Sequence, residues 1–245
     1  MRILLSGACG RMGRAIAEIC DPPSRIVAGV DQFICGAPFP IYASFADIKE
    51  SADAIIDVSH PDVLAPLLDY AIARVLPLVI ATTGANAAQE QRITDAARHI
   101  PVMRSPNFSI GINVLRELAV KAAAMLPDSD IEIVESHHRM KADSPSGTAL
   151  DIANALTAAD NRRHILNGRK PEDGRREPHQ IGVHSIRGGS GTGDHSVYFM
   201  MDGETIELKH ASHGREIFAR GALRAAAWLM DKPPGLYGMA DILSL

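Results

Sequence analysis

Short apolar segments alternate with helical stretches along the first hundred residues of the chain. The expected strands cover residues 2–6, 25–30, 54–58, 78–81 and 101–103, and the helical stretches between them cover 11–19, 62–73 and 87–99. Strands that alternate with helices pair in parallel, in a sheet that helices cover on both faces. Residues 1–107 are therefore expected to form a doubly wound, Rossmann-type α/β domain.

The pattern changes after residue 107. Strands joined by turns rather than by crossover helices predict an α+β domain with a mixed or antiparallel sheet over residues 108–215. Within it, the polar segment 157–182 could form a basic stripe that touches an anion, but a solvated, mobile loop is the expected arrangement. Residues 216–245, with a helix over 217–230 and a tail rich in Pro and Gly, are expected to pack back on the first domain. The other expected elements are a helix over 110–125 and strands over 130–136, 183–187, 195–201 and 204–210.

Composition and charge exclude several classes of protein. The net charge of −4 gives no general attraction to nucleic acid or anionic lipid, and an aromatic content of 4% is too low for stacking single-stranded bases. No run of about 18 apolar residues suggests a membrane span, and no signal-peptide pattern opens the chain. We therefore expect a cytoplasmic protein with neither a nucleic-acid partner nor a membrane partner.

The cysteines are Cys9, Cys20 and Cys35, an odd number without a Cys-x-x-Cys pair. This pattern argues against a disulfide framework and against structural zinc, and it fits a reducing compartment. Carboxylates and histidines do not follow the spacing of metal ligands either, so no metal site is expected.

A glycine-rich turn follows the first expected strand and opens the first expected helix. Its spacing, G-x-x-G-x-x-G from Gly7 to Gly13, suits a tight turn and the close approach of a pyrophosphate to the helix N-terminus. Asp31 follows Gly13 by 18 residues, close to the interval of about 20 for an acid that binds the adenosine ribose. The alternative is an ordinary glycine turn and a surface Asp; together the two features favour dinucleotide binding. The turn residues assigned to the cofactor are Gly7, Ala8, Cys9, Gly10, Arg11 and Met12.

Two later turns are expected to join this cofactor site. They follow the fourth and fifth strands, and ligands of open α/β sheets bind at the carboxyl ends of strands. Thr and Asn side chains there could contact the nicotinamide ribose and amide, although both residues are also common helix caps. The residues of these turns are Ala81, Thr82 and Thr83, and Ser105, Pro106, Asn107 and Phe108.

The segment from Glu135 to Ala149 concentrates the polar chemistry of the second domain. His137 and His138 can move protons near neutral pH, and Lys141 can hold an anion. Ser146, Gly147 and Thr148 open a helix, whose bare N–H groups suit a carboxylate or phosphate. Glu135 and Asp143 are expected to support the loop or to cap backbone groups. The combination predicts an enzyme with a small anionic substrate.

These motifs resemble those of the dihydrodipicolinate (4-hydroxy-tetrahydrodipicolinate) reductase family. Residues 135–149 are similar to its pattern E-x-H-H-x-x-K-x-D-x-P-S-G-T-A, and residues 7–13 to its pattern G-x-x-G-R-M-G. Residues 56–61, 82–84 and 106–111 resemble further family segments in the same order. The resemblance implies an NAD(P)H-dependent oxidoreductase that converts 4-hydroxy-tetrahydrodipicolinate, a small dicarboxylate, to tetrahydrodipicolinate in diaminopimelate and lysine biosynthesis. It also implies a homotetramer whose second domain binds substrate and mediates oligomerisation.

The resemblance further assigns roles to single residues. It implies that His137 is the proton donor or acceptor, with Lys141 a second candidate donor. It implies that His138, Lys141, Ser146, Gly147 and Thr148 bind the substrate. Gln32 stands after Asp31 where family members that use NADPH often carry Arg, so NADH is the expected cofactor and NADPH a possible one. Ala81 replaces the usual Gly of the family, a small change at a backbone contact.

Two other functions would fit the first domain equally well. One is another two-domain nicotinamide-dependent dehydrogenase of a small anionic substrate, and the other is a nicotinamide-binding regulator without catalysis. Another dehydrogenase does not explain the motif over residues 135–149. A regulator does not explain it either, since it leaves His137 and Lys141 without a purpose. An assay across candidate substrates would separate the first alternative, and cofactor binding without turnover would identify the second.

Overall fold

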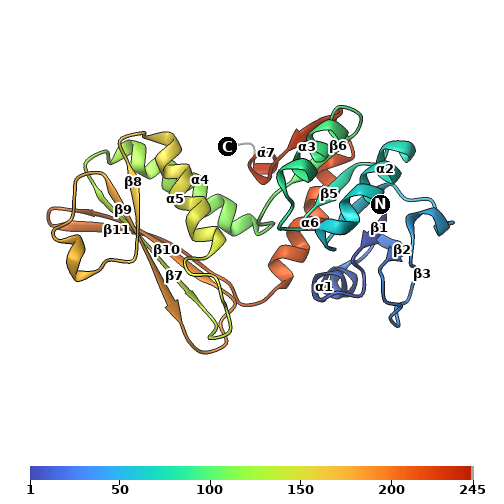
Figure 1. Cartoon of the computed structure of the whole chain (residues 1–245), viewed down its shortest axis with the longest axis horizontal. Helices are drawn as coiled ribbons and strands as arrows, with labels where there is room; N and C mark the ends of the chain where they lie inside the picture. The colour runs from blue at the N-terminus through green and yellow to red at the C-terminus, as the bar shows by residue number, and fades with distance from the viewer. Residues whose placement is uncertain (244–245) are drawn as a thin grey trace. The chain divides into compact units, whose positions relative to one another are not determined.

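The computed structural model of the chain describes residues 1–243. The chain divides into two compact units (Figure 1). Unit 1 consists of Met1–Ile110 and the segment that begins at Arg215, and unit 2 consists of Gly111–Gly214. No helix within the described residues is long and apolar enough to cross a membrane.

Unit 1 is built on a parallel sheet of seven strands in the order β12-β6-β5-β4-β1-β2-β3. The chain runs outward from β1 through β2 to β3 and then crosses back to β4 on the other side of β1, so the strand order reverses between β1 and β4. Ligands of such sheets bind at the carboxyl ends of the strands beside this reversal. The strands are β1 (Arg2–Ser6), β2 (Arg25–Val30), β3 (Ile41–Tyr42), β4 (Ala54–Asp57), β5 (Leu78–Ile80), β6 (Pro101–Arg104) and β12 (Gly235–Tyr237).

Helices cover both faces of this sheet (Figure 1). Alternate side chains of a strand point to opposite faces, so Ile3 and Leu5 pack with α1 (Arg11–Ile19), α6 (Glu216–Leu229) and α7 (Met239–Leu243). Leu4, between them, packs on the other face, with α2 (Leu64–Arg74) and α3 (Ala87–Ala96). Burial on both faces explains the continuous apolar character of these strands.

Glycines allow the turn between β1 and α1 to pass close to β4. Gly7 has a φ of +79°, and a Cβ there would lie 2.7 Å from the carbonyl oxygen of Val58. A Cβ at Gly13 would overlap the carbonyl oxygen of Gly7. Both positions therefore require glycine, one for its backbone conformation and one for close packing of helix on turn.

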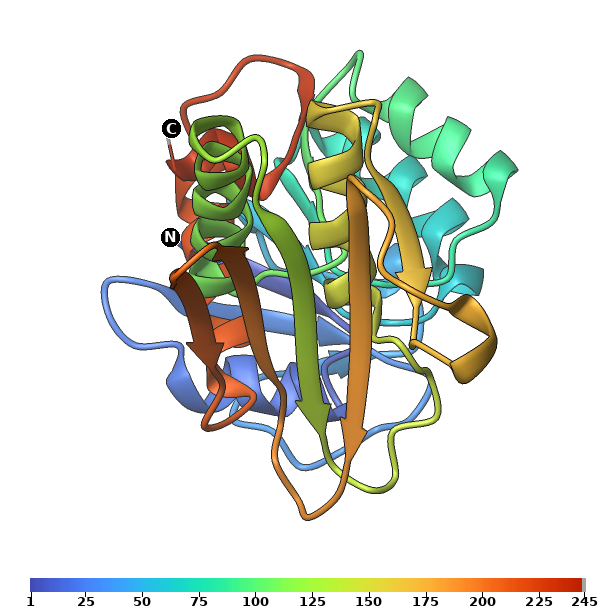
Figure 2. The same cartoon turned by 90° about the vertical axis from the view of Figure 1, so that its left-hand side faces the viewer.

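Unit 2 has one mixed sheet of five strands in the order β11-β10-β7-β9-β8. Two helices, α4 (Ile110–Met125) and α5 (Gly147–Ala159), pack together on one face of it, behind the strands in Figure 2. Ile133 and Phe199 are among the buried side chains beneath them. The expected fold class, a doubly wound parallel sheet and an α+β domain with a mixed sheet, is confirmed. The strands are β7 (Asp130–His137), β8 (His164–Asn167), β9 (Gln180–Arg187), β10 (Asp194–Met201) and β11 (Glu204–Ala211).

The expectation of a solvated loop over residues 157–182 is wrong in part. The segment contains β8 and a short 3-10 helix, Pro171–Asp173, and Arg163 is buried. Arg176 forms ion pairs with Asp130, at 2.8 Å, and with Glu132. Arg163 pairs with Asp160 and donates to the carbonyl of Pro127. Both arginines are thus held by carboxylates and carbonyls of unit 2 itself, which local polarity does not reveal.

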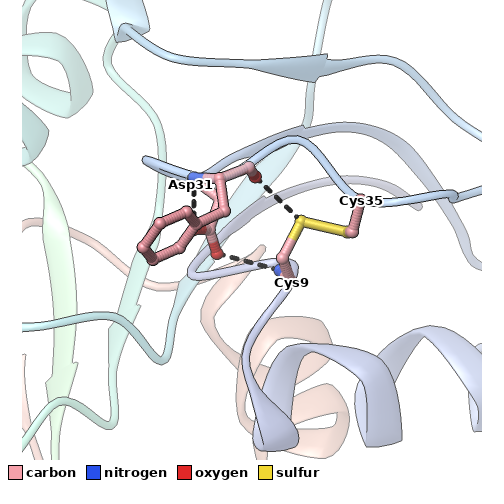
Figure 3. The surroundings of a disulfide bond; sticks show 4 residues. Cys9, Asp31 and Cys35 are labelled. Atoms are coloured by element: carbon pink, nitrogen blue, oxygen red, sulfur yellow. Dashed lines mark hydrogen bonds between the residues drawn. A yellow bond between two sulfur atoms is a disulfide. The ribbon is translucent and has the colours of Figure 1, made fainter.

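A disulfide joins Cys9 and Cys35 (Figure 3), so the cysteine pattern, which argued against disulfides, is misleading for these two residues. The two residues are 26 positions apart in sequence. They meet because β1 and β2 are parallel neighbours, which brings the turns after both strands to the same edge of the sheet. Cys20 remains a free, half-buried thiol.

The disulfide predicts the number of thiols that react in purified protein. Alkylation with iodoacetamide under denaturing conditions without reductant should add one label, at Cys20, because disulfide sulfurs do not react. Prior reduction should raise the number to three. Intact-mass and peptide mass spectrometry measure both numbers. Cys35→Ser is the matched variant and should expose Cys9; three labels without reductant would contradict the pairing.

Candidate functional site

A cavity of about 410 Å³ lies at the carboxyl ends of the unit 1 strands. Its walls come from the glycine turn, from the turns after β4, β5 and β6, and from α6. Eight residues assigned to the cofactor from sequence line it: Arg11, Met12, Ala81, Thr82, Thr83, Pro106, Asn107 and Phe108. Four lining residues were not foreseen: Val58, Ser59, Phe218 and Ala222.

Two of these four residues could have been assigned to the cavity from the sequence, and two could not. Val58 and Ser59 follow β4 in a segment that resembled the family, so their place after a strand was an available signal. Phe218 and Ala222 lie on α6, more than a hundred residues beyond the turn after β6, and no local sequence pattern marks them.

The remaining cofactor residues assigned from sequence lie beside the cavity. Gly7, Ala8, Cys9 and Gly10 form the turn before α1. Ser105 is buried, and its hydroxyl donates a hydrogen bond of 2.9 Å to the carbonyl of Asn107, which shapes the turn after β6.

Asp31 is held against the glycine turn from the neighbouring strand. Its Oδ2 accepts a hydrogen bond of 2.9 Å from the amide of Cys9, and its Oδ1 accepts one of 3.1 Å from the amide of Phe33. Figure 3 shows this carboxylate next to the disulfide. A hydrogen bond therefore joins the expected phosphate-binding turn to the expected ribose-binding acid, and a disulfide joins the same turn to Cys35, four residues beyond that acid.

Asp57 is a buried acid at the end of β4, next to a wall of the cavity. The hydroxyl of Ser59, which lines the cavity, donates a hydrogen bond of 2.5 Å to Asp57 Oδ1. Burial raises the pKa of Asp57, against the effect of hydrogen bonds from Ser59, Thr82 and Ser6. The Asp57 side chain thus fixes the hydroxyl of a lining residue rather than contacting the cavity itself.

The unit 1 edge fits a dinucleotide. Gly10 precedes α1 without a capping side chain, and the first turn of α1 has no acidic residue. The N-terminus of α1 therefore offers N–H groups and a positive dipole end that suit a pyrophosphate. Gly7 adopts the positive φ that this turn requires, a conformation that glycine reaches without steric cost.

The second group of polar residues lies at the end of β7 in unit 2. Glu135 and His137 are two residues apart in a strand, so both continue the buried face that Ile131 and Ile133 begin. His138 lies outside the strand, where its amide donates to the carbonyl of Gly191 and its carbonyl accepts from the amide of Lys141.

Glu135 is fully buried and is shared by three partners. Its Oε2 lies 2.5 Å from His137 Nδ1 and 2.7 Å from Arg187 Nη1. Its Oε1 accepts hydrogen bonds from Arg187 Nη2, at 2.6 Å, and from the amide of Ser146, at 3.1 Å. Burial alone would raise the pKa of Glu135, but the hydrogen bonds, led by that from Arg187, outweigh it and hold the pKa at about 2.

His137 lies among charges of both signs. Burial lowers its pKa, Glu135 opposes that shift, and Lys141 and Arg187 add to it, so the net direction is downward. A Cβ at Gly193 would lie 2.6 Å from His137 Nε2, so glycine leaves room around the nitrogen that Glu135 does not hold.

His195 supports the same group from β10. Its ring lies edge-on to that of His137, with centroids 5.3 Å apart, and its Nε2 lies 3.1 Å from Ser146 Oγ. Burial lowers the pKa of His195 to about 4, so the ring is neutral near pH 7.

The turn before α5 already holds one carboxylate. Lys141 Nζ lies 2.8 Å from Asp143 Oδ1, and the Lys141 hydrogen bond and the Gly147 amide both lower the pKa of Asp143. Gly147 is exposed, whereas Ser146 is buried and its Oγ accepts a hydrogen bond from the amide of Ala149. Gly147 is thus more accessible than Ser146 to a ligand from outside.

Sequence reasoning missed Arg187, His195 and Gly193 in this group. Each is more than forty residues beyond Lys141, on β9, on β10 or in the connection between them, and only sheet pairing brings it here. The Glu-x-His spacing was an available signal for the Glu135 contact. Among residues 1–243, no group of three or more His, Cys, Asp or Glu side chains could hold a metal ion.

Comparisons with known proteins cover both units. The N-terminus of dihydrodipicolinate reductase, as a protein family, matches residues 1–108, and the C-terminus matches residues 111–243. The chain is 41% identical to 4-hydroxy-tetrahydrodipicolinate reductase of Caldanaerobacter subterraneus subsp. tengcongensis, over 99% of this chain and 98% of the relative. It is 43% identical to the reductase of the same name from Akkermansia muciniphila, with 99% and 98% covered.

A solved structure agrees with these sequence matches. Dihydrodipicolinate reductase from Paenisporosarcina sp. TG-14, with dipicolinate bound, superposes with a TM-score of 0.81 at 25% identity, over 97% of each chain. The resemblance inferred from the motifs is therefore confirmed, and the chain belongs to the dihydrodipicolinate reductase family.

Proposed function

We propose that this chain reduces 4-hydroxy-tetrahydrodipicolinate to tetrahydrodipicolinate, with NADH preferred to NADPH, in diaminopimelate and lysine biosynthesis. The chain is an NAD(P)H-dependent oxidoreductase of that family, and the cofactor preference and residue roles are our own assignments. The observation that carries the proposed reaction is the Glu135–His137 pair beside Lys141 and the turn before α5. The test is an assay that follows NADH absorbance while the unstable substrate is generated in situ.

The residues of unit 2 are suited to binding a ring with two carboxylates. Lys141 and the Gly147 amide act on a carboxylate within the chain, that of Asp143, which supports their binding a substrate carboxylate. We assign Thr148 to the same carboxylate and His138 to orienting the ring. Ser146 contributes by capping α5, which keeps the N-terminus of the helix in place.

The reaction needs a proton donor and a hydride donor. Loss of the substrate hydroxyl as water leaves a conjugated ring that accepts a hydride, which the nicotinamide supplies when it is bound. We assign His137 Nε2 as the proton donor, since Nδ1 is held by Glu135. Lys141 steadies negative charge on the substrate while the proton moves.

We assign the cofactor to the unit 1 edge described above. Asp31 binds the adenosine ribose, Gly7 to Met12 surround the pyrophosphate, and the turns after β5 and β6 contact the nicotinamide half. We further propose that the enzyme is a homotetramer, as the family resemblance implies, and that it is cytoplasmic, as its composition leads us to expect.

Cofactor preference follows from the charge of Asp31. Its carboxylate should accept a hydrogen bond from a ribose 2′-hydroxyl and repel a 2′-phosphate, and Gln32 cannot neutralise that phosphate. We expect a higher kcat/KM with NADH than with NADPH, and a smaller difference in Asp31→Asn. Asp21→Asn, at an exposed position, is the control. A kcat/KM for NADPH more than about tenfold above that for NADH would contradict the assignment, a difference of about 1.4 kcal/mol.

Loss of Lys141 should affect the substrate and not the cofactor. Lys141→Ala removes a charge-assisted hydrogen bond of about 1.5–3 kcal/mol, which corresponds to a roughly ten- to hundredfold lower kcat/KM. NADH affinity, measured by fluorescence titration, should stay near that of wild type. Lys121→Ala, an exposed lysine of α4, is the control. An equal loss of NADH affinity would show that the site is misassigned or misfolded.

His137 and His138 should differ when each is replaced by Gln. His137→Gln cannot take up a proton, so kcat should fall by about 10²–10⁴, with a smaller change in KM. His138→Gln should mainly raise KM. The pKa of His137 is lowered, so the proton-donor limb of the rate, lost as pH rises, should lie below the ordinary histidine range. Single-turnover hydride transfer near the wild-type rate in His137→Gln would instead favour Lys141 as the donor.

A further inference from the structure

Glu135 connects two parts of unit 2 that the proposed chemistry uses. One carboxylate oxygen contacts His137 Nδ1, and the other accepts from the amide of Ser146, the residue that caps α5. Arg187 contacts both oxygens with the two ends of its guanidinium group, at 2.7 Å and 2.6 Å. Arg187 also donates to the carbonyl of Asp143, at 2.7 Å. All of these contacts lie within unit 2.

Packing alone does not account for this arrangement. Glu135 has no exposed surface, and removing a carboxylate from water costs several kcal/mol before any partner offsets it. An apolar pair of similar volume is often as stable as a buried ion pair. The carboxylate is thus placed where its charge and its two acceptor oxygens matter, next to the imidazole of His137.

The charge state of Glu135 determines which His137 nitrogen carries a proton. An ionised carboxylate can only accept hydrogen bonds, so the His137 nitrogen 2.5 Å away must be the donor. His137 Nδ1 therefore carries the proton in the neutral ring, and Nε2 is left to gain a proton and give it up.

We infer that the Arg187–Glu135 pair positions the proton donor of the reaction: Glu135 fixes the tautomer and orientation of His137, and the same carboxylate ties the start of α5 to that histidine. Both residues act through His137 and Ser146 and need not touch the substrate. The inference rests on the proposed role of His137 as proton donor.

The two members of the pair act on His137 with opposite sign. The charged and titratable groups around the His137 ring are Glu135 on its own strand, Arg187 on β9, His195 on β10 and Lys141 in the following turn. Glu135 favours the protonated ring, whereas Arg187 and Lys141 disfavour it. Removing Glu135 should therefore lower the pH at which the proton-donor limb is lost, and removing Arg187 should raise it.

The experiment is a double-mutant cycle read as a pH profile. Single-turnover hydride transfer is followed by stopped flow from pH 5 to 9 in wild type, Glu135→Gln, Arg187→Gln and the double variant. We expect the limb to move down by about one pH unit in Glu135→Gln and up by about one in Arg187→Gln, as for a charge within about 4–6 Å. In the double variant, which leaves no buried charge unpaired, the limb should lie between the two. In Glu135→Gln, kcat should fall about tenfold to hundredfold, and more than KM rises.

Glu132→Gln is the matched control. Glu132 lies on the same strand and also contacts an arginine and a histidine, Arg176 and His184, the latter at 2.7 Å. Its alternate position in the strand turns it to the face opposite Glu135. The limb should stay at the wild-type pH in this variant.

The outcomes separate the inference from the proposed function. If His137→Gln keeps the limb, the assignment of His137 as donor is wrong. If His137→Gln loses the limb but neither Glu135→Gln nor Arg187→Gln moves it, His137 remains the donor and the positioning role is overturned. Limbs that move in the same direction, or a double variant that lies outside the two single variants, would also overturn it. A purely structural role would reduce the amount of active enzyme and leave the limb in place.

Discussion

Burial of both faces of the parallel sheet is the constraint on which unit 1 depends. Ile3, Leu4 and Leu5 point alternately to two different helical layers. The strands between these layers pair in parallel, so successive strands are joined by crossovers. Crossovers bring all the carboxyl ends of the strands to one edge. The cavity, Asp31 and the buried Asp57 all lie at that edge, at elements far apart in sequence. The cofactor side of the enzyme is thus a consequence of how the core is covered.

In unit 2, the alternation of side chains along strand β7 places two polar residues on the buried face of the sheet. One face of β7 supplies apolar side chains to the core and, at the end of the strand, continues with Glu135 and His137. The opposite face carries Glu132 with its own arginine and histidine. Similar sets of side chains therefore occur on both faces, but only one set adjoins Lys141 and the turn before α5. Position at the strand end, rather than residue type, distinguishes them.

Elements with a strong local pattern could be predicted from the sequence. The strands β1, β2 and β4 and the helices α1 and α4 carry continuous or periodic apolar residues, and they lie where expected. β3 and β12 are short strands at the sheet edges, and β8 lies within a segment rich in charge. Their pairing depends on neighbouring strands, so propensity within the segment does not reveal them.

The residues of the candidate sites also fall into two groups, those that a local motif reveals and those that only tertiary contacts bring into the site. Within each motif, residues such as Gly7 and Gly10, or His137 and Lys141, lie close enough in sequence to be recognised from their spacing. Arg187 reaches Glu135 through the parallel pairing of β7 with β9, and Phe218 reaches the cavity through the packing of α6. Such contacts are set by tertiary structure. The Cys9–Cys35 bond belongs with them, since an odd cysteine count carries no information about which turns adjoin.

The disulfide closes a covalent ring around the helix and the second strand of the first β-α-β unit. The chain from Cys9 to Cys35 contains α1 and β2, and the bond joins its two ends. A protease cut at any peptide bond between these two residues would therefore leave both products in one molecule.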